Sequence, residues 1–121
     1  MCFQMDLTDK GYKMFFRPWQ IATLKSIWAE NNPISSREIH QNVNSNANIR
    51  ISRASIINFL NNCIEKSIIE YEIKVGKGGE HKLYKLKYNE PEFKQYLINI
   101  ILTKLLDSWP TETKSTINTL E

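Results

Sequence analysis

The chain has 121 residues, enough for one domain with a hydrophobic core. Its composition, with four glycines, two cysteines and 24% charged residues, excludes a collagen-like chain, a disulfide scaffold and a disordered chain. Charge is unevenly placed: residues 50–87 hold eight basic and four acidic side chains, whereas the remainder holds eight basic and nine acidic ones. This local positive excess suits a polyanionic partner, although a solvated basic surface would carry the same charge.

The first predicted helix follows an N-terminal extension, residues 1–16, whose Phe15 and Phe16 we expect to dock on the core. Pro18 suits the first turn of a helix, where its missing N–H costs nothing. Apolar residues then recur at three- and four-residue spacing, and they are Ile21, Leu24, Ile27 and Trp28. This spacing predicts a helix at about 18–30, ended by Asn31-Asn32-Pro33.

The second predicted helix begins with the sharpest local signal in the sequence. Ser35 and Glu38 have the spacing of a capping box, in which each side chain satisfies the other residue's backbone N–H. Ile34 and Ile39 are placed for the accompanying hydrophobic staple. Together with Val43 they predict a short helix at about 35–43.

A polar, asparagine-rich segment, residues 44–51, reads as a loop, and Ser52 then caps a third helix at about 53–66. Projected at about 100° per residue, one side of this helix is apolar, with Ile56, Ile57, Leu60, Cys63 and Ile64. The opposite side is polar and almost uncharged, with Ser55, Asn58, Asn61, Asn62 and Glu65. We expect Cys63 to be a packed core thiol.

Two strands follow the third helix. Apolar residues alternate with charged ones from Ile68 to Val75, and this period of two predicts a strand whose buried face carries Ile69, Tyr71, Ile73 and Val75. Gly76-Lys77-Gly78-Gly79 then forms a turn. A second strand holds Leu83, Tyr84, Leu86 and Tyr88, interleaved with Lys82, Lys85 and Lys87. The sequence therefore predicts a β-hairpin with a cationic outer surface.

The last predicted helix, residues 89–109, is capped by Asn89 and Glu92, with Pro91 in its first turn. Its apolar residues cover more than one stripe, so the helix must bury two faces, one of them against a partner. We expect Phe93, Leu97, Ile101 and Leu105 to form a dimer contact. Residues 110–121 are rich in Thr, Ser and Asn, and we expect a flexible tail.

The order helix, short helix, helix, hairpin, long helix is that of a winged helix-turn-helix, in which the third helix enters the DNA major groove. The expected fold class is therefore mainly α with a small β-hairpin, a winged helix-turn-helix followed by a dimerisation helix. Four parts are expected: an extension (1–16), a winged-helix DNA-binding domain (17–88), a dimerisation helix (89–109) and a tail (110–121).

Contacts to duplex DNA are assigned by chemistry. Ser55, Asn58 and Asn62 lie within plausible reach of base edges, because Asn can pair with adenine and Ser can donate or accept. The predicted hairpin would form the wing of this fold. Contacts to phosphates are expected from the basic residues Arg50, Arg53, Lys77 and Lys82, and Ser52 is a further expected DNA-binding residue.

The sequence contains no motif for metal binding, nucleotide binding, catalysis or membrane insertion. His40 and His81 have no second ligand at metal spacing, so no metal site is expected. Gly76-Lys77-Gly78-Gly79 lacks the following Lys-Ser/Thr of a nucleotide-binding loop, and no catalytic set stands out, so neither an enzyme nor a cofactor is expected. We find no membrane span or targeting segment, and two unpaired cysteines favour the cytoplasm.

Residues Trp19 to Trp109 resemble the penicillinase-repressor family, including its archaeal members. The matching segments are Leu24-Lys25-Ser26-Ile27-Trp28, Ser35-Ser36-Arg37-Glu38-Ile39, the stretch from Ser52 to Leu60, and Gly76-Lys77-Gly78-Gly79. The resemblance implies a homodimeric repressor that binds a palindromic operator and is released by proteolysis or an inducer, here unknown. Ser67 stands where the family usually has the glycine that ends the recognition helix. The paired Cys-x-Cys motifs of the copper-responsive members are absent.

The sequence thus predicts a homodimeric transcription regulator of double-stranded DNA. Two other classes remain open. One is a winged-helix protein-interaction module of a larger transcription or replication assembly. The other is a ligand-sensing regulator that holds a small apolar molecule between the last helix and the core.

Overall fold

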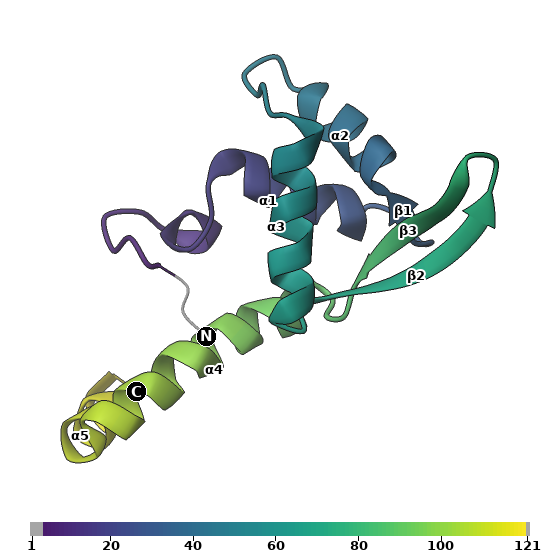
Figure 1. The fold of residues 1–121 in the computed structure, drawn as a ribbon. Helices are drawn as coiled ribbons and strands as arrows, with labels where there is room; N and C mark the ends of the chain where they lie inside the picture. The colour runs from purple at the N-terminus through teal and green to yellow at the C-terminus, as the bar shows by residue number, and fades with distance from the viewer. Residues whose placement is uncertain (1–3, 121) are drawn as a thin grey trace. The chain divides into compact units, whose positions relative to one another are not determined.

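The computed structural model describes residues 4–120, which divide into two compact units that meet between Lys87 and Tyr88. The first unit contains α1 to α3 and a three-stranded antiparallel sheet, and the second contains α4 and α5 (Figure 1). Each unit is described separately below. No helix among the described residues is long and apolar enough to cross a membrane.

The N-terminal segment carries a short 3-10 helix, η1 (Gly11–Met14), before α1 (Pro18–Trp28). Pro18 occupies the first helical position as predicted, and the Arg17 backbone N–H donates to Gln20 Oε1 at 2.9 Å. Of the predicted core residues, Leu24 and Ile27 are buried, whereas Ile21 and Trp28 are half-buried. Phe16 is also buried, as expected of the extension.

Helix α2 (Ser36–Asn44) begins where the sequence predicts. Ser35 is its N-cap, and the Ser35 Oγ accepts from the Glu38 backbone N–H at 3.2 Å. The predicted capping box is only half formed, because the Glu38 carboxylate accepts from the Ser35 hydroxyl at 3.4 Å and not from the Ser35 backbone N–H. Ile34 and Ile39 are both buried, in accord with the staple. Ile34 and Ser35 also form a short strand, β1 (Ile34–Ser35), which the sequence analysis did not anticipate. Two residues are too few to show alternation, so only the sheet defines this strand.

Helix α3 (Arg53–Glu65) is capped by Ser52, whose Oγ accepts from the Ser55 backbone N–H at 3.1 Å. Its buried side differs from the prediction: Phe59 is buried, whereas Ile57 and Ile64 are only half-buried. The rings of Phe16 and Trp19 meet Phe59 edge-on, at centroid distances of 6.1 and 5.6 Å. The N-terminal segment and α1 therefore draw the buried stripe of α3 toward Phe59.

The C-terminus of α3 forms a Schellman motif. The Ile68 N–H donates to Cys63 O at 2.9 Å and the Ser67 N–H donates to Ile64 O at 3.0 Å. Ser67 has a φ of +60°, the left-handed conformation that glycine adopts without steric cost. Ser67 therefore adopts, at the end of α3, the backbone geometry that usually favours glycine.

The predicted hairpin comprises β2 (Ile69–Gly76) and β3 (Gly79–Leu86), with β1 on the other side of β3, in the order β1-β3-β2. Gly76 pairs with Gly79, so the turn has only two central residues, Lys77 and Gly78. Gly78 has a φ of +89°, which requires glycine in practice. The hairpin is therefore longer than the sequence suggested, because β3 starts at the turn itself.

The predicted buried face of β2 is wrong beyond its first residue. Ile69 is buried, but Tyr71, Ile73 and Val75 are exposed. The hairpin runs outward from the helices of its unit (Figure 1), so only its base has helices to cover it. The alternation correctly predicted a strand, but it could not show where the core ends.

The second unit is a pair of helices, α4 (Glu90–Ser108) and α5 (Pro110–Leu120). The capping box of α4 is complete: the Asn89 N–H donates to Glu92 Oε1, and the Glu92 N–H donates to Asn89 Oδ1, both at 2.9 Å. Helix α5 replaces the expected flexible tail. Its hydroxyls bond within the helix, as when Thr116 Oγ1 donates to Glu112 O at 2.8 Å, and Thr113 Oγ1 reaches Leu105 O of α4 at 3.0 Å.

Candidate nucleic-acid interface

The exposed face of α3 carries two amides, Asn58 and Asn61, with Ala54 one turn before them and Glu65 one turn after. Because the buried stripe is drawn toward Phe59, the outward side is centred on these positions. Asn58 was predicted as a base contact, and Asn61 was left out although it projected onto the same polar face. Asn62 is exposed as well, but it lies nearer Phe59 and lines a pocket described below.

The predicted serines lie in the cap at the start of α3. The Ser52 Oγ donates to the Ser55 Oγ at 2.9 Å while accepting from the Ser55 backbone N–H. Ser52 is exposed and Ser55 is half-buried. Both hydroxyls therefore stabilise the helix start, and the Ser55 hydroxyl keeps a proton to donate.

Arg53 joins the starts of two helices. Its Nε and Nη2 donate to the Ser36 Oγ at 3.2 and 3.0 Å, so the first residue of α3 is tied to the first residue of α2. Burial raises the pKa of the Tyr84 hydroxyl in β3, and the positive charge of Arg53 opposes that shift. Arg53 therefore orients α3 against α2 and the sheet, with its other guanidinium N–H groups left for an anion.

The loop between α2 and α3 is held by side chains of α2. The His40 Nε2 donates to Ile51 O at 3.0 Å, and the Ile51 N–H donates to Asn44 Oδ1 at 2.9 Å. Asn44 in turn donates through its Nδ2 to His40 O at 3.0 Å. Arg50, in this loop, is exposed, and its Nη1 bonds the carbonyl of Ile49 at 3.0 Å. His40 is thus a packing residue that positions the approach to α3.

The wing lysines have distinct settings. Lys77 is exposed at the tip, where its carbonyl accepts from the His81 Nε2 at 3.2 Å. The Lys82 Nζ lies 4.7 Å from the centre of the Tyr71 ring, a cation–π contact on the apolar side of the hairpin. Lys85 lies on the other side, opposite Glu70. The expected cationic surface is therefore a basic tip with lysines on both sides.

The predicted dimer residues all lie on α4. Phe93 and Leu97 are already buried, and Phe93 stacks on Tyr96 with ring centroids 6.0 Å apart, so of the predicted dimer residues only Ile101 and Leu105, in the second half of the helix, keep exposed surface. Leu105 lines an apolar groove of about 580 Å³ formed by α4 and α5, together with Leu102, Trp109, Ile117 and Leu120. Trp109 and Leu120 are largely exposed. The second unit thus presents apolar surface that its own two helices do not cover.

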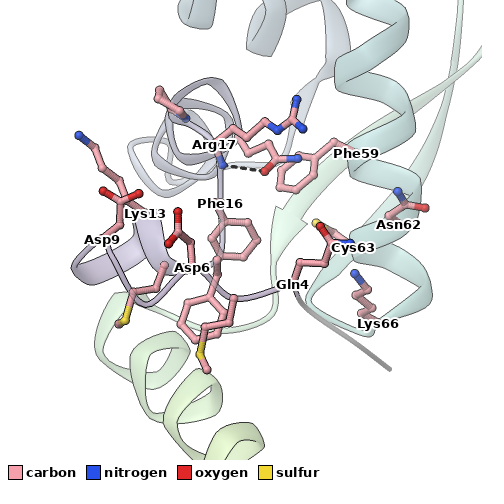
Figure 2. Close-up of a pocket in the computed structure, with 15 residues that line it drawn as sticks. Gln4, Asp6, Asp9, Lys13, Phe16, Arg17, Phe59, Asn62, Cys63 and Lys66 are labelled. Carbon is pink, nitrogen blue, oxygen red and sulfur yellow. Dashed lines mark hydrogen bonds between the residues drawn. The ribbon is translucent and has the colours of Figure 1, made fainter.

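A second hollow, of about 740 Å³, lies between the N-terminal segment and the C-terminal half of α3 (Figure 2). Phe16, Phe59 and Cys63 contribute to its walls, and Asn62 and Lys66 approach it from α3. Burial raises the pKa of the Cys63 thiol to about 12, which Lys66 opposes in part, so this thiol is protonated at neutral pH. Among the described residues no cluster of His, Cys, Asp or Glu could hold a metal ion.

Comparison with known proteins identifies the fold. No family model and no curated protein sequence matches the chain. A PadR-family transcription regulator from a hypervirulent Clostridium difficile strain matches with a TM-score of 0.51 and 18% identity, over 92% of this chain and 100% of that one. A PadR-like transcription factor from Bacteroides fragilis matches with a TM-score of 0.50 and 20% identity, over 87% and 93%.

A structure described as a candidate transcriptional regulator from Thermoplasma acidophilum matches with a TM-score of 0.53 and 16% identity, over 85% of this chain and 91% of that one. The chain therefore has the winged-helix fold of these regulators, with five α-helices in its described part and a small antiparallel sheet. This confirms the predicted winged helix-turn-helix fold, and the dimerisation role of the last predicted helix stays a prediction.

Proposed function

We propose that the chain is a sequence-specific regulator of transcription that binds double-stranded DNA as a homodimer, in the cytoplasm and without catalysis. The observation that carries the proposal is the pair of exposed amides, Asn58 and Asn61, on the third helix of a winged-helix unit whose hairpin ends in Lys77. The regulators with the same fold support the DNA-binding class.

In the proposed complex, α3 lies in the major groove. The amide groups of Asn58 and Asn61 are suited to adenine, to which asparagine can both donate and accept. Asn62 and Ser55 are candidates at the sides of the same helix. Arg50, Lys77 and Lys82 neutralise phosphates, and Arg53 orients α3 while keeping N–H groups for the backbone. Ser52 at the N-terminus of α3 adds a hydroxyl beside backbone N–H groups that favour an anion.

We further propose that α4 and α5 form the dimer contact through their apolar groove, which Leu105 lines, and that Ile101, one turn earlier on α4, extends this contact. A two-fold dimer presents two copies of α3 and so favours a palindromic operator, with half-sites about one helical turn apart or a multiple of that. The penicillinase-repressor resemblance supports repression as the regulatory outcome. The PadR regulators matched by fold are a second candidate family for the chain.

The direct test is selection of bound sequences from a random DNA pool, followed by gel-shift titration of the selected duplex at two salt concentrations. We expect a palindromic sequence and an affinity that falls steeply with salt. A chain that retards no duplex at low salt is a protein-interaction module, and the proposal is then wrong. A selected sequence without two-fold symmetry would retain DNA binding but reject the symmetric dimer.

The hollow beside α3 favours a second candidate function, regulation by a small ligand. Its volume of about 740 Å³ lies within the range of ligand sites. One of its walls belongs to α3, and another belongs to the N-terminal segment, whose Phe16 contacts Phe59 of α3. A ligand there should raise the melting temperature of the free protein and change its affinity for the selected duplex. A broad small-molecule panel that shifts neither quantity rejects this function.

A further inference from the structure

The outer edge of β2 is an unusual surface within the winged-helix unit. In the sheet order β1-β3-β2, this edge pairs with no strand among residues 4–120. The exposed fraction of its residues increases toward the tip of the hairpin, from 45% for Tyr71 to 54% for Ile73 and 75% for Val75. The strand is eight residues long and contains no proline to block pairing. Such an edge is a template for another strand.

The backbone direction of β2 shows which residues offer their hydrogen-bonding groups outward. The Lys87 N–H donates to Ile68 O at 3.0 Å, so Ile68 turns its carbonyl toward the β3 side. Because these groups alternate along an antiparallel pair, Glu72 and Lys74 also face β3. The N–H and C=O groups of Tyr71, Ile73 and Val75 therefore point to the open edge.

We propose that this edge pairs with β2 of a second copy of the chain, antiparallel and centred on Ile73. In that register Ile73 lies opposite Ile73 of the second copy, and Tyr71 lies opposite Val75. Glu72 then lies opposite Lys74 on both sides of the centre, so two pairs of opposite charges form. The outward backbone groups permit this arrangement, and the charge pattern favours it.

Neighbouring registers are less favourable. When the centre is Glu72, the two Glu72 carboxylates lie directly opposite each other. When the centre is Lys74, the two Lys74 ammonium groups lie directly opposite each other. Moving the centre to Tyr71 places Glu70 opposite Glu72. Like charges in these positions are destabilising. Ile73 is thus the centre at which cross-strand pairs of charged residues have opposite signs.

The pairing is weak by itself, because two strands alone are marginally stable in water. The strand pairing does not involve α4 and α5, which are the proposed dimer contact. It would therefore join one proposed dimer to another and form larger assemblies. On adjacent DNA sites the high local concentration would strengthen it and make binding cooperative. The inference does not depend on DNA binding, because the strand pairing forms between protein chains alone.

Charge exchange provides the first test, measured by sedimentation equilibrium of the DNA-free protein over a concentration series. Glu72→Lys and Lys74→Glu each create like-charge pairs and should weaken higher association roughly tenfold. The double variant restores opposite charges and should recover the original constant. The two single changes shift the net charge in opposite directions, so a similar loss in both would separate strand pairing from a general effect of net charge. A double variant as weak as the singles, or an unmodified chain without this association, overturns the proposal.

Disulfide formation provides the second test, in a Cys2→Ser background with the buried Cys63 left in place. In the proposed register the two Cα atoms at position 73 are about 5.5 Å apart, within disulfide range. The two atoms at position 72, or at 74, are offset by two residues and lie beyond that range. Ile73→Cys should therefore cross-link readily, and Glu72→Cys and Lys74→Cys poorly. Equal cross-linking at the three positions overturns the register.

Discussion

Asn58 and Asn61 owe their position to a residue on the other side of their helix. Phe59 meets the rings of Phe16 and Trp19, so the side of α3 that carries it is buried and the amide side faces outward. Helical projection of the sequence-predicted apolar side of α3 centres the opposite face between Asn58 and Asn62, whereas the observed burial centres it between Asn58 and Asn61. The distinction matters because base readout depends on which side chains reach the groove.

Asn58→Ala tests this assignment. We expect a loss of about 1–3 kcal/mol in binding to the selected duplex and little change on random DNA. The folded protein should not suffer, because alanine is the better helix former at an exposed position. Gel-shift titration against both duplexes measures the effect. Asn62→Ala is the matched control with a smaller expected loss, and equal losses for Asn58→Ala on both duplexes would contradict its role.

Ser67→Gly should stabilise the protein. Ser67 has a φ of +60° at the position where Schellman motifs favour glycine, and a side chain there costs about 1 kcal/mol. We expect the free energy of unfolding in urea to rise by roughly that amount. Ser115→Gly, on the exposed surface of α5, is the control and should lower stability. A Ser67→Gly variant with a lower free energy of unfolding would show that the left-handed conformation of Ser67 does not destabilise the protein.

At the scale of elements, the recognition helix is held through its neighbours. Arg53 fixes the start of α3 to the start of α2 through Ser36, while His40 and Asn44 hold the loop that leads into α3. These contacts connect segments that the chain separates by a polar loop. They explain how a loop with few apolar residues delivers α3 in a defined orientation.

Arg53→Lys should lower stability by about 1 kcal/mol, because an ammonium cannot reproduce the two N–H contacts that the guanidinium makes with the Ser36 Oγ. Thermal and urea unfolding measure the change. Arg50→Lys is the control, since the Arg50 Nη1 donates to the carbonyl of the neighbouring residue, Ile49, and not to another helix. If both variants unfold alike, Arg53 does not connect the two helices energetically.

The hairpin carries the next prediction. Lys77→Ala should weaken binding to every duplex and reduce the salt slope by about one unit, and adding Lys82→Ala should bring the reduction to at most ~2 units. Both residues are exposed, so folding should be unaffected. Affinity measured over a range of salt concentrations tests this. A slope unchanged in the double variant would remove the wing from the DNA interface.

At the scale of the whole molecule, the chain combines a winged-helix unit with a helical pair that leaves apolar surface uncovered. This arrangement is consistent with the proposed regulator, in which the first unit binds DNA and the second forms the dimer contact. The α4–α5 groove and the β2 edge are separate surfaces. The two proposals therefore predict two independent modes of association.

Ile101→Glu should convert the proposed dimer to a monomer, because it places a charge in an apolar contact. Leu120→Glu gives an independent readout: Leu120 is 81% exposed in this structure, so a charge there leaves the folded chain intact while opposing the dimer. Sedimentation measures the mass. Lys104→Glu, an exposed change on α4, is the control and should remain dimeric. Dimers in both test variants would exclude the groove as the contact.

Local chemistry determined much of the architecture. Capping residues such as Ser35, Ser52 and Asn89 set helix starts because they act on backbone groups within three residues. The alternation of apolar and charged residues, with the glycines at 76–79, predicted the hairpin. The order of helices and strands along the chain predicted the winged helix. The basic candidates and Asn58 could also be selected from the sequence by their chemistry, whereas Asn61 was recognised only from the observed burial of α3.

Tertiary structure alone decided which surfaces are covered. Phe59 is buried because rings from the N-terminal segment reach it, and Ile73 is exposed because the hairpin runs past the helices. Strand β1 exists because Ile34 and Ser35 pair with Tyr84 and Leu83, some fifty residues away. Helix α5 packs on α4, where Thr113 bonds Leu105. Burial depends on contacts between distant segments, which periodicity within one segment does not contain.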